Sequence, residues 1–158
     1  MIQKTKRSIQ WVNPHTKQVR LKNCQKCNAF FGVGVKEKYK KYAGIHLIAE
    51  FWGGQIIENL KKIEQILIGA TKAAKNTPLE IAIHKFSPRG ITGVILLAES
   101  HIALHSWPEF DYLAIDIFTC GEKAIPRKAL EYLKKKFKPK KVEIKEIKRG
   151  IFKNGKIS

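Results

Sequence analysis

Apolar and polar residues alternate along the chain in patterns that predict two helices. Across residues 55–75 the apolar positions recur in steps of three and four, which places them on one face of a helix. Across residues 126–137 apolar positions recur every fourth residue, and Pro126 suits the first turn of a helix. Both stretches therefore predict amphipathic helices that pack one face on a core.

The other apolar runs are short and predict strands. They cover residues 45–51, 79–86, 91–98, 100–107, 112–120 and a last, lysine-bearing edge strand at 140–148. Strands that follow one another without an intervening helix pair in antiparallel fashion. The sequence predicts an α+β fold: a two-layer α/β sandwich with a largely antiparallel sheet and two helices on one face.

The amino-terminal part of the chain has no sustained period. It contains Asn13-Pro14, scattered lysines and a glycine-valine repeat at 32–35. We interpret residues 1–43 as a basic extension that is partly disordered or loosely packed, and residues 44–158 as the folded domain.

Positive charge gathers at the two ends of the chain. The formal net charge is +18, with eleven Lys or Arg against one acid in 1–43 and eleven against two in 134–158. Such ends are typical of contact with nucleic acid or anionic lipid. They also fit a lysine-rich surface with no partner, which we favour because no repeating aromatic pattern interleaves the lysines.

Targeting signals and cysteine pairs are sparse. No stretch approaches the roughly 20 apolar residues of a membrane span, and the basic start lacks the apolar core of a secretory signal. We therefore expect a cytoplasmic protein with no membrane contact. Cys24 and Cys27 could form half of a zinc site completed by His15, His46 or another protomer, although a chance pair in a basic tail explains them as well.

Polar residues cluster at 99–112, directly after the most apolar strand. The cluster contains a Glu-Ser pair, two histidines, a tryptophan and a second glutamate. A serine nucleophile with a histidine base is one interpretation, but Ser100 lacks the GxSxG turn of hydrolases, and a polar edge strand is the plain alternative. Cys120 ends a strand before Gly121, where it could reach a cleft or be a small buried residue.

Four short motifs carry a family resemblance. Residues 84–122, HKFSPRGITGVILLAESHIALHSWPEFDYLAIDIFTCGE, contain FSP, Glu-Ser-His, WPE and FTCG in order. This block resembles the centre of prokaryotic S-adenosylmethionine decarboxylase proenzymes, and GIHLIAEFWGG with the helix after it resembles their amino-terminal part. The similarity runs from about residue 44 to about residue 137.

The resemblance implies that the chain cuts itself between Glu99 and Ser100 into 1–99 and 100–158, which stay together as partner fragments. The Ser100 hydroxyl would attack the Glu99 carbonyl and turn the amide into an ester. The histidine that matches His105 would then remove the Ser100 α-proton and expel the Glu99 carboxylate. The resulting dehydroalanine would hydrolyse to a pyruvoyl group and ammonia, with Thr92 at the place of a hydroxyl residue that supports cleavage.

The resemblance also implies the chemistry of the mature enzyme. A covalently bound pyruvoyl group derived from Ser100 would form a Schiff base with the amine of S-adenosylmethionine and accept electrons as carbon dioxide leaves. Cys120 matches the proton donor. Phe86 and Trp107 match rings that hold the adenine, although core packing is the competing interpretation, and Glu109 matches the acid on the ribose. The product would supply the aminopropyl donor for spermidine synthesis.

Two observations conflict with this interpretation. Ser100 and His105 have opposite parity in a strand and would face opposite sides of the sheet, which we expect a bulge or bend near Ser100 to reconcile. The charge of +18 would repel a cationic substrate, and we expect Glu50, Glu99 and Glu109 to offset it locally.

Two other functions stay open. An arginine decarboxylase of the same pyruvoyl type would share the core motifs, although the adenine and ribose residues favour a nucleoside. A basic nucleic-acid-binding module with an unused processing site belongs to a different class and predicts an intact chain. For the enzyme, the resemblance implies a homo-oligomer whose active sites are shared between protomers.

Overall fold

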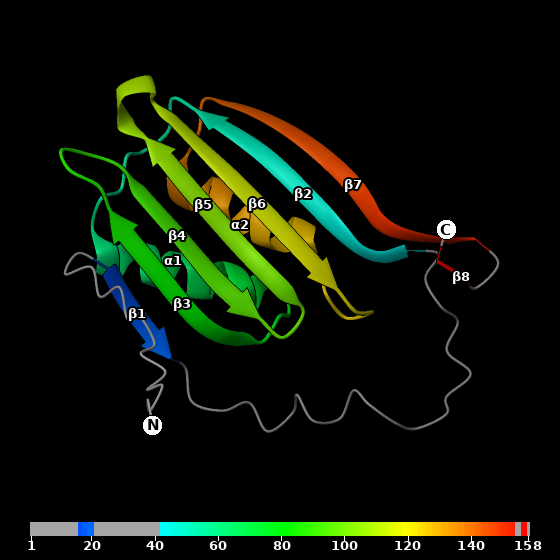
Figure 1. Ribbon diagram of the computed structural model, residues 1–158. Coiled ribbons are helices and arrows are strands. Elements are labelled where there is room, and N and C mark those ends of the chain that lie inside the picture. Colours follow the sequence, from blue (N-terminus) through cyan, green and yellow to red (C-terminus); the bar gives the residue numbers. More distant parts are fainter. Residues whose placement is uncertain (1–15, 21–41, 154–155, 158) are drawn as a thin grey trace, which may run out of the picture.

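The protein folds as one antiparallel sheet with two helices packed on one of its faces (Figure 1). The computed structural model describes residues 16–20, 42–153 and 156–157, with side chains for 42–151. The sheet order is β1-β3-β4-β5-β6-β2-β7-β8, and all neighbouring strands are antiparallel. This confirms the predicted α+β sandwich.

The elements have the following bounds. The strands are β1 Thr16–Arg20, β2 Tyr42–Trp52, β3 Pro78–Lys85, β4 Ile91–Leu97, β5 Ser100–Trp107, β6 Tyr112–Cys120, β7 Lys141–Lys153 and β8 Lys156–Ile157. The helices are α1 Leu60–Ala73 and α2 Pro126–Phe137, and a short 3-10 turn, η2, spans Pro108–Phe110. Neither described helix is long and apolar enough to cross a bilayer.

Helix α1 begins later than the periodicity predicts. Asn59 caps it, because its side-chain oxygen accepts the Lys62 N–H at 3.0 Å. The preceding segment 55–59 runs instead along the end of α2, where the Gln55 N–H donates to the Phe137 carbonyl at 2.6 Å. Ile57 in this segment is buried in the core although its backbone is not helical. An apolar residue there extended the sequence pattern beyond the true start of the helix.

The two edges of the sheet also differ from the sequence prediction. Strand β1 lies inside the predicted extension 1–43 and pairs with β3 from Thr16↔His84 to Arg20↔Glu80. The division of the chain into an extension and a domain stays a prediction. Strand β7 is longer than the predicted 140–148, and it lies at an edge for most of its length because β8 pairs only with Phe152 and Lys153.

The core lies between the sheet and the helices. Strand residues alternate between this buried side and the opposite side. The fully buried side chains include Leu47, Phe51, Ile95, Ile102, Ile115 and Ile117 of the sheet and Ile63, Leu67 and Leu133 of the helices. Each such side chain contributes about 1.5–3 kcal/mol through removal of apolar surface from water.

No described helix covers the other side of the sheet, which we call the open face (Figure 1). By alternation and register its residues include His46, Ile48 and Glu50 of β2, Thr92, Val94 and Leu96 of β4, His101, Ala103, His105 and Trp107 of β5, and Tyr112, Ala114, Asp116 and Phe118 of β6. Most of them are half-buried, and the candidate histidines lie among them.

We expect Leu67→Ala to lower the free energy of unfolding by about 2–5 kcal/mol, because Leu67 is fully buried where α1 meets Gly93 of β4. Urea unfolding at one protein concentration measures this, in a Ser100→Ala background because the resemblance implies that such a chain would stay whole. Gln65→Ala on the exposed side of α1 is the control and should change stability by less than about 0.5 kcal/mol. A loss below about 1 kcal/mol for Leu67→Ala would contradict the packing described.

Candidate active site

The Glu99-Ser100 peptide bond lies in the tight connection between β4 and β5. Strand β4 ends at Leu97, which pairs directly with Ser100, the first residue of β5. The φ angle of Ser100 is +136°, a value that residues other than glycine rarely adopt. Such a backbone costs on the order of 1–3 kcal/mol. Ser100 therefore carries a strained torsion at the start of β5.

Glu99 is held at both of its functional groups. Its carbonyl oxygen accepts the backbone N–H of Cys120 at 2.9 Å. Its carboxylate accepts the Thr77 N–H at 2.8 Å and the Thr77 hydroxyl at 3.2 Å. Thr77 was not identified from the sequence, since it lies in the connection before β3 and belongs to none of the motifs. These contacts fix the carbonyl that a nucleophile would attack.

Ser100, Cys120 and His101 complete this end of the site. The Ser100 Oγ lies 3.2 Å from the Nδ1 of His101. The Cys120 side chain is exposed at the end of β6 and lines a small surface pocket with Tyr42 and Gly121. We call Glu99, Ser100, His101 and Cys120 the serine cluster.

The other predicted residues gather at the opposite end of β5. His105 Nδ1 forms a hydrogen bond with Thr92 Oγ1 on the paired strand β4. The His105 ring lies 3.9 Å from the Trp107 ring and 5.8 Å from the Phe86 ring, measured between centroids. We call Phe86, Thr92, His105, Trp107 and Glu109 the histidine cluster.

Electrostatics at the histidine cluster favour a neutral imidazole. Burial lowers the pKa of His105 below its usual 6.5, and the negative charge of Glu109 opposes this shift in part. A neutral histidine can accept a proton, as a general base must. Glu109 and Phe86 are exposed, so both are accessible to a ligand.

The two clusters do not meet within one chain. Ser100 and His105 are five residues apart on an extended strand, or about 16 Å. His105 pairs with Thr92 and Ala114 of the open face, whereas Ser100 pairs with Leu97 and Thr119, which are buried on the helix side. The expectation that a bulge or bend brings Ser100 and His105 to one face is wrong for a single chain. The register of β5 with both neighbours is continuous, so no extra residue is present to shift the parity.

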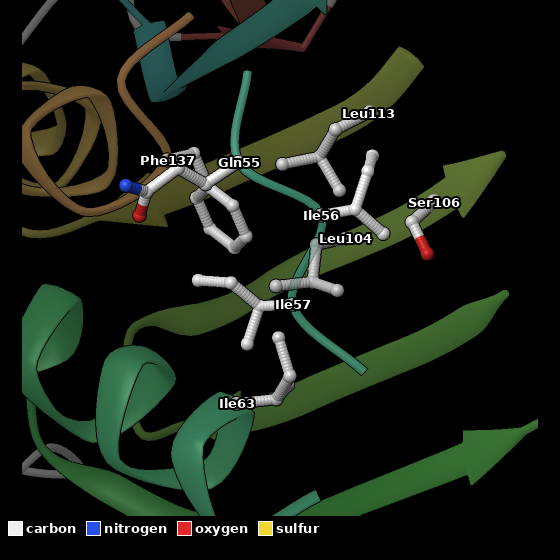
Figure 2. A pocket seen from close by; sticks show the side chains of 8 residues that line it. All are labelled: Gln55, Ile56, Ile57, Ile63, Leu104, Ser106, Leu113 and Phe137. Atoms are coloured by element: carbon white, nitrogen blue, oxygen red, sulfur yellow. The ribbon is translucent and has the colours of Figure 1, made fainter. Parts of the chain in front are cut away.

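A pocket on the helix side of the sheet contains none of the predicted residues (Figure 2). Its lining is mostly apolar: Gln55, Ile56, Ile57, Ile63, Leu104, Ser106, Leu113 and Phe137. The Ser106 side chain links two strands, because its Oγ accepts the Ile91 N–H at 2.9 Å. We interpret this pocket as a crevice of the core.

The predicted zinc candidate cannot be placed. Cys24 and Cys27, like His15, lie outside the described residues, and the candidate stays a prediction. Within the part of the chain that the structure describes, no group of three or more His, Cys, Asp or Glu side chains is arranged to hold a metal ion.

Comparison with known proteins gives one consistent result. The family model described as S-adenosylmethionine decarboxylase matches residues 45–150. The S-adenosylmethionine decarboxylase proenzyme of Methanococcus maripaludis strain S2 is 44% identical over 119 residues, which cover 74% of this chain and 98% of the relative. The proenzyme of the same name from Acetivibrio thermocellus is 45% identical over 111 residues, which cover 69% and 90%.

A solved structure agrees with these sequences. The crystal structure of the adenosylmethionine decarboxylase from Aquifex aeolicus VF5 superposes with a TM-score of 0.67 at 33% identity, and the match covers 75% of this chain and 100% of that one. All residues of the serine and histidine clusters lie within the range 45–150 that the family model matches.

Proposed function

Because the chain belongs to the S-adenosylmethionine decarboxylase family, we propose that it is a proenzyme that cuts itself between Glu99 and Ser100 and then decarboxylates S-adenosylmethionine. The observation that carries this proposal is the geometry of that peptide bond. Its carbonyl is held by the Cys120 N–H, and its serine has a φ of +136°. The decarboxylated product would supply aminopropyl groups for spermidine synthesis.

The surroundings of Ser100 fit the formation of a pyruvoyl group. Ser100 provides the carbon skeleton, and the exposed Cys120 thiol lies on the residue whose N–H binds the neighbouring carbonyl. Once formed, the group supplies an electrophilic carbonyl that withdraws electrons from the substrate while carbon dioxide leaves. The exposed Cys120 thiol would then return a proton to the substrate carbon.

Three features of the site support the cleavage step. The Cys120 N–H would stabilise negative charge on the Glu99 carbonyl oxygen during attack, and loss of one such donor typically costs about 10²–10³ in rate. Thr77 holds the carboxylate of Glu99 and so limits movement of the segment. The strained φ torsion of Ser100 no longer exists once the bond to Glu99 is broken, so cleavage releases that strain.

The separation of the two clusters supports an active site built from two copies of the chain. Neither helix of the described residues covers the open face, which carries apolar side chains such as Val94 and the half-exposed Leu96. A two-fold axis that lies between two packed open faces and runs across the direction of β5 above Ala103 would reverse the strand of the second copy. It would bring Ser100 of one chain towards His105 of the other, with the two sheets packed about 10 Å apart.

The histidine cluster would then bind the substrate and complete the cleavage. His105 of the second copy would remove the α-proton of Ser100 and expel the Glu99 carboxylate. Phe86 and Trp107 offer aromatic faces to an adenine ring and a sulfonium. Glu109 is exposed beside them for the ribose hydroxyls.

We expect freshly purified protein to show two fragments, 1–99 and 100–158, on a denaturing gel and by intact mass, instead of one chain of 18.1 kDa. Borohydride should reduce a ketone at the start of the second fragment and abolish activity. Release of labelled carbon dioxide should be much faster from S-adenosylmethionine than from arginine. A whole chain with an unmodified serine would overturn the proposal. Release of carbon dioxide from arginine but not from S-adenosylmethionine would overturn the proposed substrate.

A further inference from the structure

The Ser100 hydroxyl has a histidine beside it that differs from the one assigned by the family resemblance. We propose that His101 is the base that takes the Ser100 hydroxyl proton in the first step of cleavage, when the amide becomes an ester. The inference rests on the proposed self-cleavage and extends it by a second histidine. Under this proposal His101 acts within its own chain, and His105 of the second copy acts only afterwards.

Distance favours His101 over His105 for this step. The His101 Nδ1 lies 3.2 Å from the Ser100 Oγ, at the limit of direct proton transfer. His105 of the same chain lies about 16 Å away along β5, and its Nδ1 is hydrogen-bonded to Thr92. Neighbouring residues of a regular strand point to opposite sides. The unusual φ of Ser100 departs from that regular geometry and accompanies the contact with the adjacent ring.

Neighbouring strands hold the His101 ring in place. Phe118 of β6 contacts it edge-on at 6.0 Å between centroids, and His46 of β2 does so at 6.4 Å. The His46 ring is itself fixed, since its Nε2 lies 3.0 Å from the Asp116 Oδ1. The Arg149 guanidinium of β7 covers Phe118 at 5.1 Å. These contacts leave the Nδ1 of His101 directed at Ser100.

The charges around the ring keep it neutral. Burial lowers the pKa of His101 below 6.5, and the neighbouring His46 and Arg149 lower it further, whereas Asp116 raises it. On the β4 side the paired residue is the uncharged Leu96. A lowered pKa means that more than half of the rings are neutral at pH 6.5 and nearly all at pH 8. The Nδ1 can then accept a proton at neutral and mildly alkaline pH.

The step balances without any co-reactant. The proton of the Ser100 hydroxyl passes to the His101 Nδ1 while Oγ bonds to the Glu99 carbonyl carbon, and the Cys120 N–H stabilises the resulting oxyanion. The carbon–nitrogen bond then breaks. His101 returns the proton to the departing Ser100 nitrogen, which leaves an ester and a free amine.

Hydroxylamine separates the two histidines, because it cleaves esters much faster than amides. We expect His101→Ala to accumulate as an 18.1 kDa chain that resists hydroxylamine, with conversion slowed at least about 10²-fold. We expect His105→Ala to accumulate a chain that hydroxylamine cuts between residues 99 and 100. Added imidazole should accelerate cleavage of His101→Ala, which loss of packing alone would not allow.

Two further variants control for folding. Leu96→Ala removes the cross-strand neighbour of His101 and should leave the first step, measured as hydroxylamine-sensitive ester plus cleaved chain, at the wild-type rate, because that step takes place within one chain. His101→Gln keeps much of the side-chain volume but cannot carry the proton, so it should be arrested like His101→Ala even if the latter misfolds.

The outcomes distinguish this inference from the function on which it rests. If His101→Gln cleaves as fast as the wild type, His101 has no role in the first step, whereas the proposed self-cleavage still stands. A hydroxylamine-sensitive ester in both His101 variants would also overturn the role of His101, because the first step would then proceed without the ring. A wild-type chain that never cleaves would overturn the proposed function itself.

Discussion

Ser100→Ala chains should stay whole at 18.1 kDa and release no carbon dioxide from S-adenosylmethionine above the uncatalysed background. Alanine lacks the hydroxyl that attacks the Glu99 carbonyl, and no pyruvoyl group can form from it. Since enzymes accelerate reactions by at least about 10⁶-fold, loss of the reactive group removes essentially all activity. Intact mass and labelled carbon dioxide release measure the two effects on the same preparation.

Ser106→Ala is the matched control for this experiment. Ser106 lies on the same strand, but its Oγ accepts the Ile91 N–H on the helix side of the sheet. Its loss should cost about 1–3 kcal/mol of stability through the unpaired amide, while the chain still cleaves. Carbon dioxide release by Ser100→Ala would contradict the pyruvoyl mechanism.

Mixing two inactive variants should restore cleavage. Alone, neither Ser100→Ala nor His105→Ala should form a pyruvoyl group. In a mixed dimer, the His105→Ala chain supplies Ser100 and the Ser100→Ala chain supplies His105, so one of the two composite sites is complete. With equal expression and random pairing, about half of the His105→Ala chains should be converted. Mass spectrometry of a fragment 100–158 that borohydride can reduce measures this.

The control for mixing is a chain that carries both substitutions. Coexpressed with His105→Ala, the Ser100→Ala/His105→Ala chain offers the same surface but no His105, so conversion should stay at the level of His105→Ala alone. Equal conversion of His105→Ala with the Ser100→Ala chain and with the doubly substituted chain would contradict a site shared between copies. The absence of conversion with both would contradict it as well.

The sequence pattern predicted elements whose structure depends on local spacing. Strands β4, β5 and β6 and both helices follow from alternation and from steps of three and four. The pattern did not predict elements whose bounds or existence depend on contacts between residues far apart in the sequence. The start of α1 depends on the bond from Gln55 to Phe137, and β1 has only Val19 as an apolar residue and exists through its pairing with β3.

The candidate site was predictable residue by residue but not as an arrangement. Motif resemblance singled out Ser100, His105 and Cys120, and parity along β5 showed that the first two cannot face each other. The expected bulge was wrong because hydrogen bonding on both sides of β5 is uninterrupted. His101 escaped notice as a base because adjacent strand residues normally diverge, and only the torsion of Ser100 shows otherwise.

The strand order decides what holds the cut protein together. Residues 1–99 contain β1 to β4 and residues 100–158 contain β5 to β8, yet β2 lies between β6 and β7. The two pieces are therefore interleaved along three ladders, β4 with β5, β6 with β2, and β2 with β7. Dissociation would require all three to open at once. Once melted, the pieces would have to find each other in solution, so thermal inactivation of the processed enzyme should be far less reversible than that of an uncut chain.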